Sequence, residues 1–417
     1  MSLLINIIPL VVILALLFKR QHMLFAGLVG GILAILIGGL EFSKAAQMFV
    51  GGISNMLGIT IPIIYAASAA MVSKAGSIES LVELSRRSLK GKISVLAGII
   101  VLIQGFATYM AGMGAGNTMV TAPLVAAAVG AVPEVIAAMA IVSAVGFTTS
   151  PASTETVLAA ESAGRDVIAH AAAMRPYTIA FYLLAAGLAI YGVHKRGVLI
   201  KENVKKENNS NDKSNKTLLK QSIPAIALLV MVVGGSKLNA LIGINLFSPA
   251  TAVIFTGILT VILTPLSITE TCDSLIDGSR FILTTLFAVG IFLSFINMVS
   301  ELGTFQQLAA LASNVPESII LPVAMIIAFL IAIPSGAFTA GVLTLILPTL
   351  SALGLPSEAM GFVAIATGLG TQISPVQINV AALAEGFDID IIDVIKGNLK
   401  YILGTLVLLI VIGIIVI

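Results

Sequence analysis

The most polar part of a long apolar stretch is the segment GFTTSPASTETVLAAE, residues 146–161. Glu155 lies near its middle, and a charge at the centre of a bilayer costs at least ~2.5–3.5 kcal/mol. We therefore expect Glu155 to face a cavity or a partner, as a group that binds and releases H⁺ or Na⁺. The alternative is a structural carboxylate that caps the start of a helix, and the two roles are compatible.

Hydroxyl groups surround this acid. With the carbonyl groups of unwound backbone, they offer the oxygen ligands that bind Na⁺ in membrane proteins. The candidate Na⁺ ligands are Thr148, Thr149 and Glu155, and Thr154 and Thr371 are further candidates for ion coupling. Thr149 is also a candidate for binding a polar solute, as is Ser153.

Two serine–proline pairs, Ser150–Pro151 and Ser374–Pro375, predict helices that break inside the membrane. Proline lacks an N–H group, and the residue before it avoids helical geometry. A continuous helix over 133–163 would be ~46 Å long, against a hydrocarbon core of ~30 Å. We expect the helices to stop near Gly146 and Gly370 and to restart with the serine of each pair as the N-cap residue.

Two further stretches, 93–130 and 318–351, place a polar, glycine-bearing middle between apolar halves. The middles read GMGAGNTMVT and IPSGAFTAG, and we interpret both stretches as re-entrant hairpins of two half-length helices. Their helix starts near Asn117–Thr118 and Thr339, with the two restarted helices, would direct four N-termini at one centre. Such positive ends hold an anion without a buried arginine, and no Lys or Arg lies in the middle of these elements.

Composition sets the class of protein in which these elements lie. Of the 417 residues, 58% are hydrophobic and 10% are charged, whereas soluble domains carry about 25% charged residues. We expect an all-α polytopic membrane protein surrounded by lipid, with no nucleic-acid partner. HExxH, a GxxxxGK[ST] phosphate loop and a Cys/His cluster are absent, so neither an enzyme nor a cofactor other than the coupling ion is predicted.

Apolar runs long enough to span a membrane predict ten crossings. The runs are 2–18, 23–40, 49–73, 133–163, 172–193, 222–236, 249–266, 281–299, 356–385 and 399–417. The segment 194–220 is basic, and we interpret it as a cytoplasmic linker. With ten crossings, this orientation places 18 of the 22 Lys and Arg residues on the cytoplasmic side and both termini outside the cell membrane.

Two pairs of similar segments indicate an internal repeat. MVSKAGSIESL (71–81) matches MVSELGTFQQL (298–308), and SPASTETVLAAE (150–161) matches SPVQINVAALAE (374–385). We interpret residues 1–193 and 221–417 as two repeats, each of five crossings and one hairpin. Because five is odd, the second repeat is expected to be inverted, an arrangement typical of secondary transporters.

The segments SPASTETVLAAESAGRDVIAHAAAMRPYTIAFYLLAAGLAIYGVHKR (150–196) and GLGTQISPVQINVAALA (368–384) resemble the anaerobic C4-dicarboxylate carrier family. More broadly, the layout is similar to the ion transporter superfamily, which includes citrate and gluconate carriers and Na⁺/H⁺ antiporters. The resemblance implies a homodimer with an elevator-like motion. It points to these binding positions: Asn117, Thr118, Ser150, Pro151, Glu155, Ser335, Gly336, Thr339, Ser374, Pro375 and Asn379.

The second hairpin departs from that family in its proline and phenylalanine, and the second break in its two glutamines and an asparagine. The leading prediction is a secondary active transporter of small organic anions, of the di- or tricarboxylate type, coupled to Na⁺ or H⁺. The alternative is a Na⁺/H⁺ antiporter in which Glu155 binds the cations. A channel is disfavoured because neither a repeated filter loop nor a ring of charges is visible.

Overall fold

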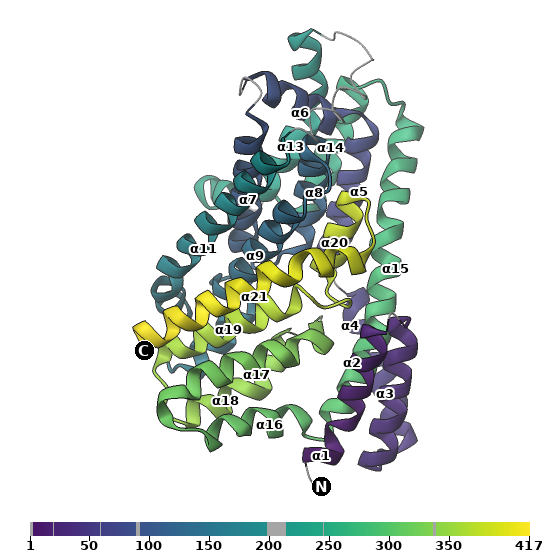
Figure 1. Cartoon of the computed structure of the whole chain (residues 1–417). Coiled ribbons are helices and arrows are strands. Elements are labelled where there is room, and N and C mark those ends of the chain that lie inside the picture. Colours follow the sequence, from purple (N-terminus) through teal and green to yellow (C-terminus); the bar gives the residue numbers. More distant parts are fainter. Residues whose placement is uncertain are drawn as a thin grey trace.

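The computed structural model describes residues 3–19, 21–58, 60–88, 92–197, 214–244, 246–336 and 339–417. Within these ranges the chain is built from helices, and it forms no strand. The helices are α1 Leu3–Asn6, α2 Ile8–Phe18, α3 Met23–Gly38, α4 Phe42–Leu57, α5 Thr60–Lys74, α6 Ser77–Ser88, α7 Ile93–Ala111, α8 Ala115–Val129, α9 Pro133–Thr149, α10 Thr154–Ser162, α11 Val167–Lys195, α13 Asn215–Ile242, α14 Pro249–Leu263, α15 Ile268–Ser300, α16 Thr304–Ala309, α17 Ile320–Ser335, α18 Thr339–Ala352, α19 Ser357–Thr371, α20 Ile378–Phe387 and α21 Ile391–Val416 (Figure 1). Two short 3₁₀ turns, Ala310–Asn314 and Glu317–Ile319, precede α17.

Several of these helices are long and apolar enough to cross a membrane, so the chain is an all-α, membrane-spanning protein. Among the described residues there are five such helices, Ile93–Ala111, Val167–Lys195, Ile268–Ser300, Glu317–Ser335 and Ile391–Val416. The bent pair α9 and α10 makes a sixth span if it is counted as one. The count of ten crossings stays a prediction, because α2, α3 and α14 are apolar but shorter.

Three predicted segments have different bounds in the structure. The run 49–73 is not one helix: α4 ends at Leu57 and α5 begins at Thr60. Pro62 lies in the first turn of α5, the part of a helix where a missing N–H is tolerated. The first arm of each hairpin is also longer than the predicted half-helix, because the apolar run continues without a break through all of α7 and α17.

The predicted linker 194–220 is helical at both of its ends. Helix α11 continues to Lys195, and α13 begins at Asn215 with Ser214 as its N-cap. Residues 198–213 lie outside the described residues. The helices therefore extend further into this segment than its basic and polar composition predicts.

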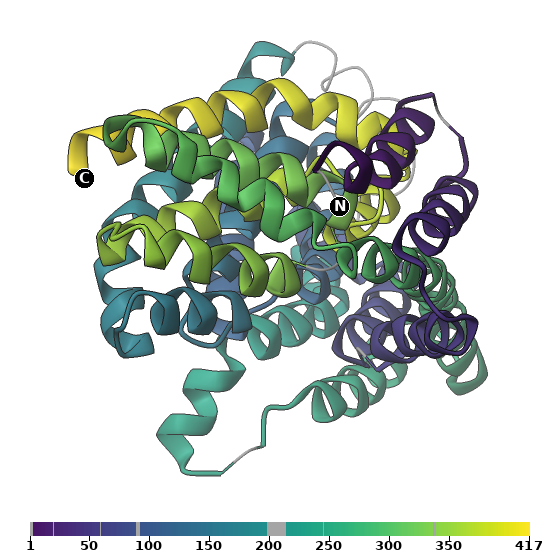
Figure 2. The ribbon, with the colours of Figure 1, turned by 90° about the horizontal axis from the view of Figure 1, so that it is seen from below.

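The same order of elements follows in each half of the chain. A helix pair (α7 and α8, or α17 and α18) precedes a broken helix (α9 and α10, or α19 and α20), and a long helix (α11 or α21) comes last. Figure 2 shows α2, α3 and α15 together on one side, with α17, α18 and α21 on the other. That the halves are inverted repeats remains a prediction.

Ion pairs show that α9 and α19 start at opposite ends of the helix bundle. Glu134, in the first turn of α9, binds Arg196 at the end of α11, at 3.0 Å. Glu358, in the first turn of α19, binds Arg165, which follows α10, at 2.7 Å. Helix α19 therefore begins at the end of the bundle where the α9–α10 span finishes.

Helices α9 and α19 lie in the interior of the helix bundle. Every residue from Glu134 to Thr149 is buried, as is every residue from Ala359 to Thr371. The two helices touch where Gly368 faces Ala144 and Thr148, and a β-carbon on Gly368 would lie 2.7 Å from the Thr148 methyl group. Small residues permit this close approach, which brings the two breaks near each other.

Candidate functional site

The first broken helix bends by 51° between α9 and α10. Helix α9 continues to Thr149, three residues beyond the predicted stop, and α10 restarts at Thr154. Its N-cap is Ser153, whose Oγ accepts a hydrogen bond from the Thr156 N–H at 3.2 Å. The prediction that Ser150 is the N-cap is wrong, because residues 150–153 form the turn between the two helices. Ser150 Oγ donates a hydrogen bond to the Tyr109 carbonyl at 2.5 Å.

The second broken helix has the same design. Helix α19 ends at Thr371, and α20 begins at Ile378 with Gln377 as its N-cap. Ser374 is therefore not the N-cap either; its Oγ accepts from the Val376 N–H at 3.3 Å within the turn. Pro151 and Pro375 both lie in the non-helical link, because a proline that ends one helix leaves its neighbours extended before the next can start.

Each hairpin tip rests against the break of its own half. Gly112, between α7 and α8, has φ +71° and lies so close to the first break that a β-carbon would come within 2.5 Å of the Ala152 carbonyl oxygen. Gly336, at the end of α17, lies against Ser374 in the second break, and a β-carbon there would overlap the serine hydroxyl. Both tips need glycine because no space is left for a side chain.

A buried hydrogen-bond network joins the first hairpin to the second break. Thr118 Oγ1 on α8 donates to Asn379 Oδ1 on α20 at 2.6 Å, and Asn379 Nδ2 donates to Gln372 Oε1 at 2.7 Å. Gln104 Nε2 on α7 donates to Thr118 Oγ1 at 2.6 Å and to Ser143 Oγ on α9 at 2.9 Å. All five side chains are at most 3% exposed. We call this set (Gln104, Thr118, Ser143, Gln372 and Asn379) the central network.

Other predicted site residues lie around the central network but bind their own backbone. Asn117 Nδ2 binds the Met113 carbonyl at 2.9 Å, and Thr371 Oγ1 binds the Gly368 carbonyl at 2.6 Å. At the second hairpin, Ser335 binds the Ile331 carbonyl at 2.5 Å and Thr339 binds the Gly336 carbonyl at 3.3 Å. Their side chains are buried, and each uses a donor group in these local bonds.

The candidate Na⁺ ligands are not joined into one cluster in this structure. Thr148 and Thr149 are fully buried and donate to the Ala144 and Val145 carbonyls at 2.7 and 2.8 Å. Thr154 is exposed, and Glu155 is partly buried in the first turn of α10. Among the residues that the structure describes, none donates a hydrogen bond to the Glu155 carboxylate through its side chain.

Two residues of the site were missed by the sequence analysis. Gln104 is the hub of the central network, and its one signal was an amide within the otherwise apolar run 93–111. Asn398 on α21 donates to the Gln372 carbonyl at 3.3 Å, and its Oδ1 is buried without a partner. Its neighbours Lys396 and Lys400 made this asparagine look like part of a helix end.

The central network consists of amides and hydroxyls and carries no formal charge. Amide N–H and hydroxyl groups donate to carboxylate oxygens, and amide oxygens accept from ammonium or hydroxyl groups. In this structure these groups satisfy one another. The sequence matches no protein-family model and no curated protein.

Proposed function

We propose that this chain is a secondary active transporter of small organic anions, of the di- or tricarboxylate type, coupled to Na⁺ or H⁺. The observation that supports it best is the meeting of two broken helices and two glycine-tipped helix pairs around the central network. Irregular backbone at membrane depth is tolerated only where protein buries it or where it lines a water-filled cavity, and broken helices form the solute sites of secondary transporters.

The resemblance to the ion transporter superfamily adds the remaining parts of the proposal. The chain would work as a homodimer in the cell membrane, with its termini outside and the segment 194–220 in the cytoplasm. The helix pairs and broken helices would carry the solute in an elevator-like motion past α4, α5 and α15. Exposed apolar side chains such as Ile254 and Ile262 on α14 would face lipid.

The protein can be tested after reconstitution into proteoliposomes. We expect uptake of labelled succinate, malate or citrate that is driven by an imposed Na⁺ or H⁺ gradient and is absent from empty liposomes. Proton flux driven by a Na⁺ gradient, with no uptake of any carboxylate, would instead identify the Na⁺/H⁺ antiporter. That alternative is favoured by one observation: the Glu155 side chain is partly buried, and no described side chain donates a hydrogen bond to its carboxylate.

Glu155→Gln tests the coupling role directly. The amide cannot exchange a proton and is a weaker cation ligand, so the coupled uptake should fall at least about tenfold, which corresponds to about 1.4 kcal/mol. Folding and membrane insertion should be unchanged, as judged by gel filtration. Glu161→Gln, at an exposed acid on the same helix, is the matched control. Uptake by Glu155→Gln with normal Na⁺ and pH dependence would show that this residue has no coupling role.

A further inference from the structure

Basic side chains from α11 and α21 gather around one buried carboxylate. Glu134 accepts hydrogen bonds from Arg196, which follows α11, at 3.0 and 3.2 Å, and from the Tyr401 hydroxyl on α21 at 2.8 Å. Lys400 Nζ lies 4.6 Å from the centre of the Tyr401 ring. The ends of the two helices therefore meet at Glu134. We call the four basic residues at these ends the basic site: Lys195, Arg196, Lys396 and Lys400.

The basic site carries more positive charge than its carboxylates neutralise. Arg196 is paired with Glu134. Within the described part of the chain, no carboxylate forms an ion pair with the three lysines, and all three are exposed. Asp393 lies one turn before Lys396, in the first turn of α21, where it also faces the positive end of that helix. An anion that reaches the basic site would therefore meet ammonium groups that are free to bind it.

On α21 the lysines begin a face that is otherwise apolar. Lys396, Lys400, Leu403 and Val407 follow one another at intervals of four, three and four residues, so they lie on one face of the helix. Leu403 and Val407 are exposed, and no other element covers them. This face is therefore cationic at the start of the helix and apolar along its length.

Helix α11 has a similar face that runs in the opposite chain direction. Lys195 follows Tyr191 by four residues and Leu184 by eleven, and both of these are exposed. The Lys195 ammonium group lies 5.7 Å from the centre of the Tyr191 ring. Both helices thus place cations at the same end and apolar side chains beyond it. A lipid has the same order of parts, with a charged head group joined to apolar chains.

We propose that the basic site binds the head group of an anionic phospholipid, whose chains lie along the exposed apolar faces of α11 and α21. Phosphate oxygens accept strong hydrogen bonds from ammonium groups, and basic pockets between membrane helices bind such head groups. Lys195 and Arg196 belong to the segment predicted to be cytoplasmic, and the cytoplasmic leaflet carries the anionic lipids. The inference concerns the membrane around the protein and does not depend on the solute that is transported.

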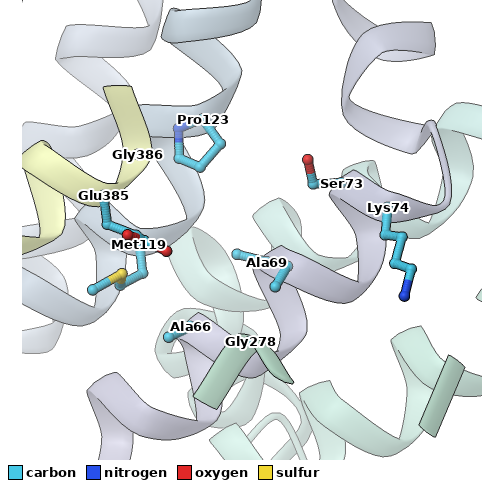
Figure 3. A pocket seen from close by; sticks show the side chains of 10 residues that line it. Ala66, Ala69, Ser73, Lys74, Met119, Pro123, Gly278, Glu385 and Gly386 are labelled. Atoms are coloured by element: carbon cyan, nitrogen blue, oxygen red, sulfur yellow. The ribbon is translucent and has the colours of Figure 1, made fainter. Parts of the chain in front are cut away.

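Lys74, at the end of α5, provides a matched control at another predicted cytoplasmic helix end. Figure 3 shows its side chain pointing away from the cavity between α5, α8, α15 and α20. The charge of Lys74 acts on Glu270, and Glu385 lines the cavity, so the surroundings of this lysine are acidic. Lys74→Gln therefore removes one exposed positive charge without touching the basic site.

The test measures the Tm of the full chain, purified in detergent, as lipid is added. Phosphatidylglycerol is compared with phosphatidylcholine of the same chain length and with inorganic phosphate. We expect phosphatidylglycerol to give the largest rise in Tm, because it alone joins an uncompensated negative charge to apolar chains. Lys396→Gln and Lys400→Gln should each require about two- to fivefold more phosphatidylglycerol for the same rise, the range of one exposed charge contact.

Both variants keep the buried pair of Glu134 and Arg196, so their Tm without lipid should equal that of the wild type. Lys74→Gln should respond to phosphatidylglycerol as the wild type does. An equal rise with both lipids, or an equal lipid requirement in all variants, would overturn the inference. An equal rise with inorganic phosphate would overturn the lipid as the ligand, and an equal loss in Lys74→Gln would show general surface charge instead of a site. None of these outcomes bears on the proposed transport, because no uptake is measured.

Discussion

At the scale of single residues, the main feature is that the candidate binding groups are already bonded to one another. Thr118 accepts from Gln104 and donates to Asn379, so one hydroxyl connects three helices from both halves of the chain. A buried polar group that loses its partner costs about 1–3 kcal/mol. The central network therefore stabilises the structure as it stands, and under the proposed function a ligand would have to replace these bonds with bonds of its own.

Thr118→Val tests this account of stability. Valine has the shape of threonine but cannot donate or accept, so Gln104 and Asn379 would each lose a bond. We expect the free energy of unfolding to fall by about 1–3 kcal/mol, measured as a lower Tm of the detergent-purified protein. Thr344→Val is the control, because that exposed hydroxyl binds only the Ala340 carbonyl of its own helix. Equal changes in the two variants would show that the network contributes no special stability.

The sequence predicts some residues of the central network, but not which side chains they bind. Thr118 and Asn379 stand out because each lies beside a break or a hairpin tip in an apolar run. Gln104 lies eight residues before the nearer of these, the tip at Gly112, and only the packing of α7 against α8 and α9 brings its amide to Thr118 and Ser143. Such contacts depend on how helices pack, which a local pattern does not encode.

At the scale of helices, the two breaks are held in place by the hairpin tips. Gly112 lies against the backbone of Ala152, and Gly336 lies against the side chain of Ser374, so each tip contacts the turn in its own half. The serine–proline pairs predict that the helices break, because proline removes an N–H group. They do not predict where the helix restarts, because the length of the turn follows from the angle that packing imposes. Ser153 and Gln377 therefore replace the predicted caps.

Gly336→Ala should disturb the second break. The added methyl group would overlap the Ser374 hydroxyl, and overpacking of this kind costs about 1–3 kcal/mol. The variant should have a lower Tm and reduced uptake. Gly404→Ala is the matched control, since Gly404 lies within α21 and has open space around it. There the change should be neutral or stabilise the helix by up to about 1 kcal/mol. Normal stability and uptake in Gly336→Ala would mean that this contact is dispensable.

The ion pairs at the starts of α9 and α19 should differ in strength. The Glu134 side chain is 4% exposed and binds both Arg196 and Tyr401, whereas the Glu358 side chain is 30% exposed. Arg196→Gln leaves a buried carboxylate without its cation, so we expect a loss of about 3 kcal/mol in the free energy of unfolding. Arg165→Gln should cost at most about 1 kcal/mol. Thermal unfolding of the two variants side by side would decide this, and a larger effect at Arg165 would contradict it.

At the scale of the whole molecule, the hairpin of the first half binds the broken helix of the second half through the hydrogen bond from Thr118 to Asn379. The same order of elements recurs in the two halves. The segment matches near the breaks predict this recurrence, because glycine, serine and proline constrain backbone wherever they occur. The number of crossings was harder to predict, since an apolar run such as 49–73 does not show that α4 and α5 are separate helices. Orientation follows from the basic residues alone and stays a prediction.

The central claim is that a small carboxylate binds where the two halves meet, and its binding can be measured as a rise in Tm. A ligand of the folded state stabilises it by RT ln(1 + [L]/Kd), whatever the starting stability. The panel is succinate, citrate, aspartate and alanine, each with and without Na⁺, on the wild type, Thr118→Val, Gln104→Leu and Thr344→Val. We predict that a ligand which raises the Tm of the wild type and of Thr344→Val raises that of the two network variants much less. An equal rise in all four proteins would contradict the account.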